Sequence, residues 1–251
     1  MIMSLQNKNI VVIGASSGIG LAIAQFAASQ GANVIIGARR QDLLYKSLVT
    51  LDGNGRFYAR KVDASKETDV KSFINFCVEK FGPLDGIAHC VGKHEFLPAA
   101  LVSDDNFAQL FNTNVKSAQY VAKYAIKRLK YNPDGLSVVF LSSTAAQKGS
   151  AGASMYSATK AALEGMSRSM ALEFSKKKIR FNCVAPGMVR TDISDAMLET
   201  LGEENFNKII SAHPLGIGKP ENVAHGVCFL LSDYAKWITG TVLVIDGGYS
   251  T

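Results

Sequence analysis

Residues 10–20 of the chain read IVVIGASSGIG: four apolar residues of β-forming type, then a turn that contains three glycines. A segment of helical period, residues 19–29, follows this turn directly. The same order of short apolar run and helical segment recurs along the chain. Further apolar runs lie at residues 34–36, 86–88, 137–141, 181–184 and 241–245, and further helical segments at residues 67–81, 104–129 and 154–174. This alternation predicts an α/β fold, a doubly wound parallel sheet of about seven strands with helices on both faces.

Length and composition favour one domain. The chain has 251 residues, of which 47% are hydrophobic and 19% charged, enough for one large core. No linker or internal repeat divides it, so a single domain over residues 1–251 is expected.

No stretch approaches the roughly 18 consecutive apolar residues of a membrane-spanning helix, and no signal peptide is found. We therefore expect no membrane association and a cytoplasmic location. The four cysteines lie far apart, which argues against disulfides and a metal site.

The net charge of +6 makes an anionic partner worth considering. The basic runs, such as residues 176–178, are short, and they end helical segments, where cations complement the helix dipole. They lack the interleaved aromatic residues of single-stranded nucleic-acid sites, so no nucleic acid is expected as a partner. Docking of an acidic carrier protein is the alternative explanation of these runs.

The glycine turn has the composition of a phosphate cradle. Gly14, Gly18 and Gly20 allow a tight turn and a close approach of a pyrophosphate to the backbone, while the following helix offers free N–H groups and a favourable dipole. Their spacing differs from the common Gly-x-Gly-x-x-Gly pattern. Ser16, Ser17 and Ile19 belong to the same turn, and all six residues are candidate cofactor ligands. The alternative is a plain strand-to-helix turn.

The second apolar run indicates which dinucleotide would bind. An NAD site normally has an acidic residue at the end of this strand, whereas an arginine accommodates a 2′-phosphate. Here the strand ends in Gly37 and Ala38 and is followed by Arg39 and Arg40, whose guanidinium groups suit a phosphate. The sequence therefore predicts NADPH rather than NADH, unless both arginines are only solvated residues at a helix start.

Tyr156 and Lys160 lie one helical turn apart and share a face of the 154–174 helix. An ammonium group near the phenol could lower its pKa by three units, which takes about 4 kcal/mol, and make it a usable acid or base. Ser142 and Ser143 end the preceding strand, where this fold places catalytic groups. Such a Tyr–Lys pair also occurs by chance on many helices.

Together these motifs resemble the short-chain dehydrogenase/reductase family, from about residue 9 to residue 248, and the likeness extends to 3-oxoacyl-acyl-carrier-protein reductases. The glycine motif matches, except that Ile13 stands where a threonine is usual, and the Tyr-x-x-x-Lys pair matches Tyr156 and Lys160. The family's serine, thirteen positions before the tyrosine, falls on Ser143. Further matches are Asn114 for the family's catalytic asparagine, Asp63 beside the adenine, Gly92 after the fourth strand, and Pro186, Gly187, Val189 and Thr191 beside the nicotinamide.

The resemblance implies a Rossmann-type fold and a role for each residue. Tyr156 would protonate a substrate carbonyl as hydride arrives from NADP(H), Ser143 would hydrogen-bond the same oxygen, and Lys160 would hold the nicotinamide ribose. Asn114 would anchor a water that relays protons to Lys160. The implied activity is reduction of a small-molecule ketone to a secondary alcohol by a homotetramer. The candidate substrates are a 3-oxoacyl thioester, free or bound to a carrier protein, and a sugar-derived or xenobiotic ketone. A non-catalytic NADP-binding regulator is the rival from another class of protein.

Two further parts of the sequence are not accounted for by the matching motifs, namely residues 89–90 and residues 192–220. His89 and Cys90 stand where the family usually has two asparagines, which puts the local geometry of the sheet in question. A metal cluster of these residues with His94 and Glu95 is not expected, because adjacent strand side chains point to opposite faces. Residues 192–220 are expected to form a substrate lid with an apolar face that includes Met197, Leu198, Leu201, Phe206, Ile209 and Ile210, or to pack onto the body or another subunit.

Overall fold

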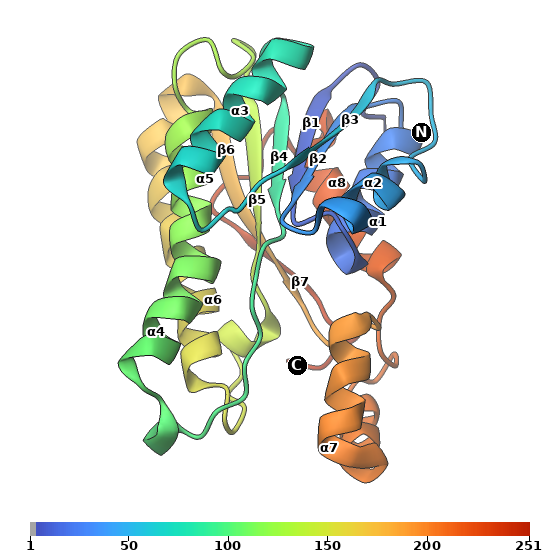
Figure 1. Cartoon of the computed structure of the whole chain (residues 1–251), viewed down its shortest axis with the longest axis vertical. Coiled ribbons are helices and arrows are strands. Elements are labelled where there is room, and N and C mark those ends of the chain that lie inside the picture. Colours follow the sequence, from blue (N-terminus) through green and yellow to red (C-terminus); the bar gives the residue numbers. More distant parts are fainter. Residues whose placement is uncertain (1–3) are drawn as a thin grey trace.

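The computed structural model describes residues 4–251, apart from the side chains of residues 193, 196–201 and 205. Its centre is one parallel sheet of seven strands in the order β3-β2-β1-β4-β5-β6-β7 (Figure 1). The strands are β1 (Asn9–Ile13), β2 (Asn33–Ala38), β3 (Phe57–Lys61), β4 (Gly86–His89), β5 (Leu136–Leu141), β6 (Ile179–Pro186) and β7 (Val242–Ile245). The predicted fold class, number of strands and parallel sheet are confirmed.

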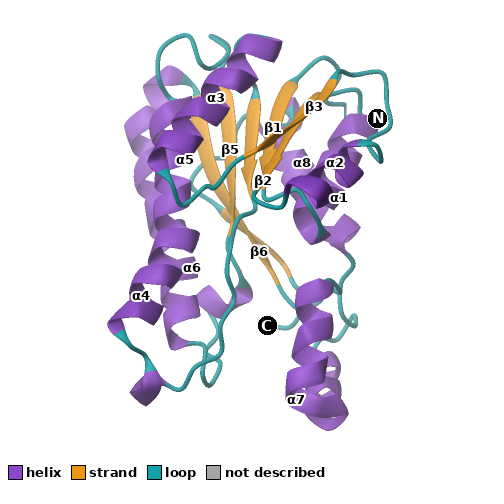
Figure 2. Cartoon of the chain, in the orientation of Figure 1, coloured by secondary structure: helices purple, strands orange, loops and turns teal. Residues whose placement is uncertain are grey.

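Helices cover both faces of the sheet, which gives three layers (Figure 2). On one face lie α1 (Gly18–Ser29), α2 (Gln41–Leu48) and α8 (Pro220–Leu231), and on the other α3 (Glu67–Phe81), α5 (Ser117–Ala125) and α6 (Ser154–Phe174). Two further helices, α4 (Asp104–Phe111) and α7 (Asp192–Ser211), extend beyond the carboxyl ends of the strands on opposite sides of the molecule (Figure 1).

Side chains of β1 show why the strands are apolar throughout. Ile10 and Val12 pack into the core beneath α1 and α8, whereas Val11 and Ile13 pack into the core beneath α3 and α5. All four are fully buried, because successive strand residues point to opposite faces and helices cover both. Burial of each such side chain contributes about 2 kcal/mol. The sheet is therefore a rigid support for the loops that follow its strands.

The helices α2 and α8 were not among the helical segments named from the sequence, and two further elements differ from the prediction. β3, at the edge of the sheet, was not among the apolar runs, because Arg60 and Lys61 make it partly polar. The helical segment expected at residues 104–129 is interrupted by a π-helical turn, Asn112–Lys116, and its last helix ends at Ala125. Leu129 has a positive φ of 68°, which an α-helix cannot contain.

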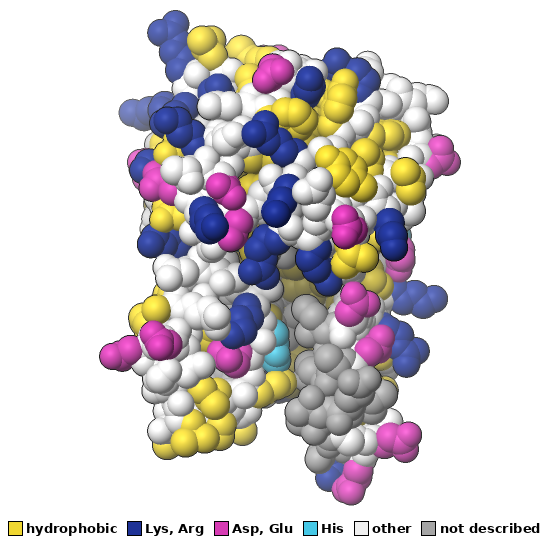
Figure 3. Space-filling view, viewed as in Figure 1, with side chains coloured by type: hydrophobic (Ala, Val, Ile, Leu, Met, Phe, Trp, Pro, Cys, Tyr) yellow, Lys and Arg dark blue, Asp and Glu magenta, His cyan; other side chains and the backbone are white. Residues whose placement is uncertain are grey.

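The carboxyl ends of the strands open into a groove. β1 lies between β2 and β4, so the chain reverses its direction of progression through the sheet at this point. In such sheets ligands bind in the crevice that this reversal creates. Figure 3 shows several lysine and arginine side chains near the middle of this face of the molecule. Within residues 4–251, no helix is both long and apolar enough to cross a membrane.

Candidate active site

The glycine turn after β1 is packed so closely that it requires glycine. Gly14 has a φ of 92°, and a Cβ on it would lie 2.8 Å from the backbone carbonyl carbon of Cys90. A Cβ on Gly20 would collide with the carbonyl oxygen of Gly14. Gly18, with a φ of 57°, begins α1. The turn therefore brings bare backbone to the edge of the groove.

The N-terminus of α1 is open towards this turn. Ser17 caps the helix by position, but its side chain makes no capping hydrogen bond, and the first turn contains no acidic residue. The free N–H groups and the positive end of the helix dipole therefore suit an anionic group. Together with the close-packed glycines, this arrangement fits the pyrophosphate of a dinucleotide.

The glycine turn borders a cavity of about 750 Å³, the size of a dinucleotide site. Most of the predicted cofactor ligands line it: Gly14, Ser16, Ser17, Gly18, Ile19, Gly20, Arg39, Arg40, Asp63, Gly92 and Thr191. These residues follow β1, β2, β3, β4 and β6, so five strand ends contribute to one cavity.

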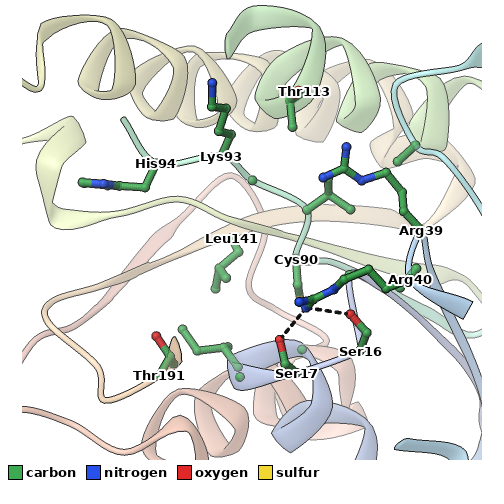
Figure 4. Close-up of a pocket in the computed structure, with 18 of the residues that line it drawn as sticks. Ser16, Ser17, Arg39, Arg40, Cys90, Lys93, His94, Thr113, Leu141 and Thr191 are labelled. Atoms are coloured by element: carbon green, nitrogen blue, oxygen red, sulfur yellow. Dashed lines mark hydrogen bonds between the residues drawn. The ribbon is translucent and has the colours of Figure 1, made fainter. Parts of the chain in front are cut away.

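The two predicted arginines have different neighbours. Arg40 donates hydrogen bonds to the hydroxyl groups of Ser16, at 3.2 Å, and Ser17, at 3.0 Å, across the mouth of the cavity (Figure 4). Burial raises the pKa of the Asp63 carboxyl, but hydrogen bonds from Ser65 and the charge of Arg39 outweigh it, so the net shift is downward. Arg39 thus lies on the Asp63 side of the cavity and Arg40 on the glycine-turn side.

A second cavity, of about 260 Å³, continues from the first and holds the predicted catalytic groups. Ile19, Cys90, Gly92, Leu141 and Thr191 line both cavities. Ser143 follows β5, and Tyr156 and Lys160 come from the first two turns of α6. The remaining predicted nicotinamide residues, Pro186, Gly187 and Val189, line this second cavity with them.

Ser143 and Ser142 have different tasks. The hydroxyl of Ser142 is buried and donates to a Glu164 carboxylate oxygen at 2.9 Å, so it ties the end of β5 to α6. Ser143 accepts a hydrogen bond from the backbone N–H of Ala145 at 3.2 Å, and its side chain acts to lower the pKa of the Tyr156 phenol. Of the two candidates, only Ser143 influences the pKa of the tyrosine.

The Tyr156 phenol departs from the sequence expectation. Burial raises its pKa above the usual value, and the Ser143 side chain only partly offsets this. The expected lowering by Lys160 is absent, since the Lys160 Nζ lies 5.6 Å from the ring centroid and donates instead to the Leu141 carbonyl at 2.7 Å. The phenol therefore stays protonated at neutral pH, as a proton donor requires.

Lys160 is almost fully buried, and burial lowers the pKa of its ammonium group to about 8. The side chain passes close to Gly92, where a Cβ would lie 3.2 Å from Nζ and 3.7 Å from the Asn114 Oδ1. Glycine at position 92 thus leaves room beside both polar groups.

Asn114 lies in the π-helical turn and is fully buried, lining neither cavity. Its Oδ1 accepts the backbone N–H of Lys93 at 2.7 Å, and its Nδ2 donates to the Lys93 carbonyl at 3.0 Å and to the Thr159 hydroxyl at 2.9 Å. Asn114 therefore joins the loop after β4 to α6 beside Lys160.

His89, which replaces the family's first asparagine, also acts on this turn. Its Nε2 lies 2.9 Å from the Ser117 hydroxyl, which donates its proton to the Thr113 carbonyl at 2.5 Å. Nε2 must therefore carry the ring proton, while the buried Nδ1 has no partner. Burial, and then the charge of Lys160, lower the pKa of His89 to about 3, so the ring is neutral. His89 thus fastens β4 to the start of α5, and the sheet keeps its geometry.

Cys90, the second replacement, packs against the glycine turn, and burial raises the pKa of its thiol to about 12. No cluster of three or more histidine, cysteine or carboxylate side chains suited to a metal ion occurs among the described residues.

Several residues of the second cavity were not predicted as site residues: Lys93, His94, Phe96, Lys148, His213 and Tyr249. The His94 ring packs edge-on against Tyr156, with centroids 4.4 Å apart. Ile209 and His213 come from the end of the expected lid, α7 and the segment after it, whereas the side chains of Met197, Leu198 and Leu201 lie outside the described part of the chain. Their position in the segments that follow β4, β5, α7 and β7 was the signal that could have found them.

These cavities define a dinucleotide-binding oxidoreductase site, and comparisons with known proteins give the family. A family model described as enoyl-(acyl carrier protein) reductase matches residues 14–250. The chain belongs to the short-chain dehydrogenase/reductase family of oxidoreductases, which use NAD(P)(H) and act on CH–OH and C=O groups.

Curated relatives align over almost the whole chain. A 3-oxoacyl-[acyl-carrier-protein] reductase of Mus musculus is 38% identical over 244 residues, covering 96% of this chain and 98% of the relative. A tropinone reductase homologue of Arabidopsis thaliana is 34% identical, covering 98% and 94%. Among solved structures, a short-chain dehydrogenase/reductase of Mycobacterium ulcerans has a TM-score of 0.93 at 30% identity, covering 99% and 91%. An actinorhodin polyketide ketoreductase variant solved with NADPH has a TM-score of 0.92 at 27% identity, covering 99% and 100%.

Proposed function

We propose that this protein reduces a ketone to a secondary alcohol with NADPH as the hydride donor. The observation that carries the proposal is the meeting of Ser143, Tyr156 and Lys160 in a cavity that continues into one fitted to a dinucleotide. A non-catalytic regulator would need the first cavity but not this set of hydroxyl and ammonium groups in the second.

The residues of the chain have separate tasks in this reaction. The Tyr156 hydroxyl donates its proton to the carbonyl oxygen, and the Ser143 hydroxyl hydrogen-bonds that oxygen as negative charge develops on it. When bound, NADPH supplies the hydride. Lys160 binds the nicotinamide ribose, while Asn114 orders the proton path behind Lys160. Support for Tyr156 as an acid comes from its burial, which raises its pKa and keeps the proton on the phenol.

The preference for NADPH rests on the first cavity. Arg39 and Arg40 both line it, and no carboxylate stands at the end of β2 to repel a 2′-phosphate. The hydroxyl groups of Ser16 and Ser17 already accept hydrogen bonds from Arg40, so these three side chains form a ready set of partners for phosphate oxygens.

We also propose that the protein is a homotetramer and that it is located in the cytoplasm. The tetramer is supported by exposed apolar side chains that a contact between subunits would cover. Phe107 on α4 is 48% exposed, and Leu172 on α6 is 82% exposed.

A panel of ketones tests the proposal. Purified protein is expected to consume NADPH, followed by its absorbance, with at least one member of a panel of 3-oxoacyl thioesters, aliphatic ketones, sugar-derived ketones and short keto acids. A kcat on the order of 1–100 per second is expected for a good substrate. The 3-oxoacyl thioesters are included because several relatives are named for this activity. Tight NADPH binding without consumption of NADPH or NADH on any ketone would favour the regulator instead.

NADPH binding is expected to weaken above pH 8. Because the pKa of Lys160 is about 8, the ammonium that binds the ribose loses its charge as the pH rises through this value. The Kd for NADPH, measured by fluorescence quenching, should increase about 10-fold between neutral and strongly alkaline pH. The arginine in Lys160→Arg keeps its positive charge over this pH range, so the Kd of this variant for NADPH should change little with pH. An inflection that persists unchanged in Lys160→Arg would assign the ionisation to another group.

A further inference from the structure

The charged side chains around the second cavity are of one sign. Its lining includes Lys93, Lys148 and Lys160, whereas no aspartate or glutamate occurs among its described lining residues. Lys93 lines both cavities, whereas Lys148 and Lys160 line only the second, so cationic side chains are part of the wall of the second cavity. Such a lining favours a substrate that carries negative charge.

The three lysines differ in how far their charges are already used. Lys160 belongs to the catalytic set, and its Nζ donates to the Leu141 carbonyl. Lys93 forms an ion pair with Glu95 at 3.1 Å and also donates to Gln109. Lys148 has no carboxylate partner among the described side chains. Its charge is therefore the one that neither catalysis nor an ion pair uses.

Lys148 is exposed but held in place. Its Nζ donates to the Tyr249 carbonyl at 2.6 Å and lies 4.1 Å from the centroid of the Tyr249 ring. Tyr249 stacks on His213, with centroids 4.4 Å apart and planes at 10°. His213 accepts the Met188 backbone N–H at 3.0 Å, which connects the stack to the loop after β6. One N–H of the ammonium group is used by Tyr249, and two remain for a ligand.

We propose that Lys148 binds a carboxylate of the substrate, so that the preferred ketones are short keto acids. This proposal rests on the ketone reduction proposed above. A fixed ammonium group forms a charge-assisted hydrogen bond with a carboxylate at little ordering cost, because Tyr249 already holds it. The cavity of about 260 Å³ is below the usual range for ligand pockets, which favours a short chain between the ketone and the acid.

Pairs of acids and amides test the role of Lys148. The probes are pyruvate, acetoacetate and laevulinate, each beside its uncharged amide, with NADPH consumption as the readout. For the preferred acid, Lys148→Gln is expected to raise KM about 10-fold, while kcat and the KM of the amide change less than about 2-fold. Lys148→Arg should recover most of the loss, because it restores the charge. The chain length of the preferred acid reports the distance between Lys148 and Tyr156.

A matched control separates this role from a structural one. Lys127→Gln removes a lysine whose Nζ lies 4.5 Å over the Tyr124 ring, outside both cavities, and should change nothing. Equal loss for acid and amide in Lys148→Gln would show that Lys148 only holds Tyr249, and no loss for either would also overturn the proposal. So would reduction of neutral ketones without any preference for keto acids.

A binding measurement keeps the proposal testable if no ketone is turned over, which would overturn the proposed function alone. Ligand-observed NMR with the NADPH-loaded protein would compare butyrate with butyramide. Wild type should bind butyrate more tightly, and Lys148→Gln should remove this difference. Equal binding of the two probes by wild type would overturn the assignment of Lys148.

Discussion

Tyr156→Phe is expected to lower the kcat for ketone reduction about 10³-fold, because it removes the hydroxyl that we propose as the proton donor to the carbonyl oxygen. The phenylalanine ring keeps the edge-on contact with His94 and the volume of the cavity wall. NADPH affinity should therefore stay within about 2-fold of wild type, so that the loss lies in kcat. Single-turnover kinetics with a saturating ketone, together with NADPH titration by fluorescence, measures both quantities.

Tyr120→Phe is the matched control, since Tyr120 lies on α5 outside both cavities. It should retain wild-type kcat. Full activity in Tyr156→Phe would require another proton donor in the second cavity, and Ser143→Ala would then be the variant to examine first.

Cofactor preference is the second large effect. Arg39→Asp is expected to shift the ratio of kcat/KM for NADPH over kcat/KM for NADH by about 100-fold towards NADH, which corresponds to about 2.7 kcal/mol. The substitution removes a proposed cationic partner of the 2′-phosphate, and the new carboxylate repels that phosphate. It also stands next to Asp63, so the variant should be compared with Arg39→Gln, which removes the charge without reversing it.

Arg40→Gln separates the two arginines. Because Arg40 bonds Ser16 and Ser17, its loss should weaken phosphate binding on the glycine-turn side of the cavity. Arg128→Asp makes the same charge change as Arg39→Asp outside both cavities and should leave the preference unaltered. If neither Arg39 nor Arg40 variants changed the ratio, the proposed NADPH preference would be wrong.

The fold was predictable because its strands are buried on both faces, which leaves a continuous apolar signal such as residues 10–13. The same reasoning explains the omissions. β3 is an edge strand whose Arg60 and Lys61 interrupt the apolar pattern. The π-helical turn at Asn112–Lys116 contains a single apolar residue, Val115, so the apolar pattern does not mark the extra residue per turn.

The candidate site was predictable where its residues lie on one element or at a strand end. Tyr156 and Lys160 share α6, and Ser143 ends β5, so their spacing places them together. The direction of the pKa shift of Tyr156 was not predictable, because it depends on burial rather than on which residues are near in sequence. The contacts of His89 with Ser117 and of Lys148 with Tyr249 join residues 28 and 101 positions apart, which no local pattern encodes.

The stack of Tyr249 between Lys148 and His213 has a practical consequence for anyone who purifies this protein. Tyr249 lies two residues before Thr251 and stacks on His213, which follows α7. Figure 1 shows the C-terminal end in this part of the molecule. An affinity tag fused after Thr251 would start two residues from Tyr249, which lines the second cavity, and its first residues would compete for space there or displace the tyrosine. Kinetic work should therefore use protein whose C-terminal tag has been omitted.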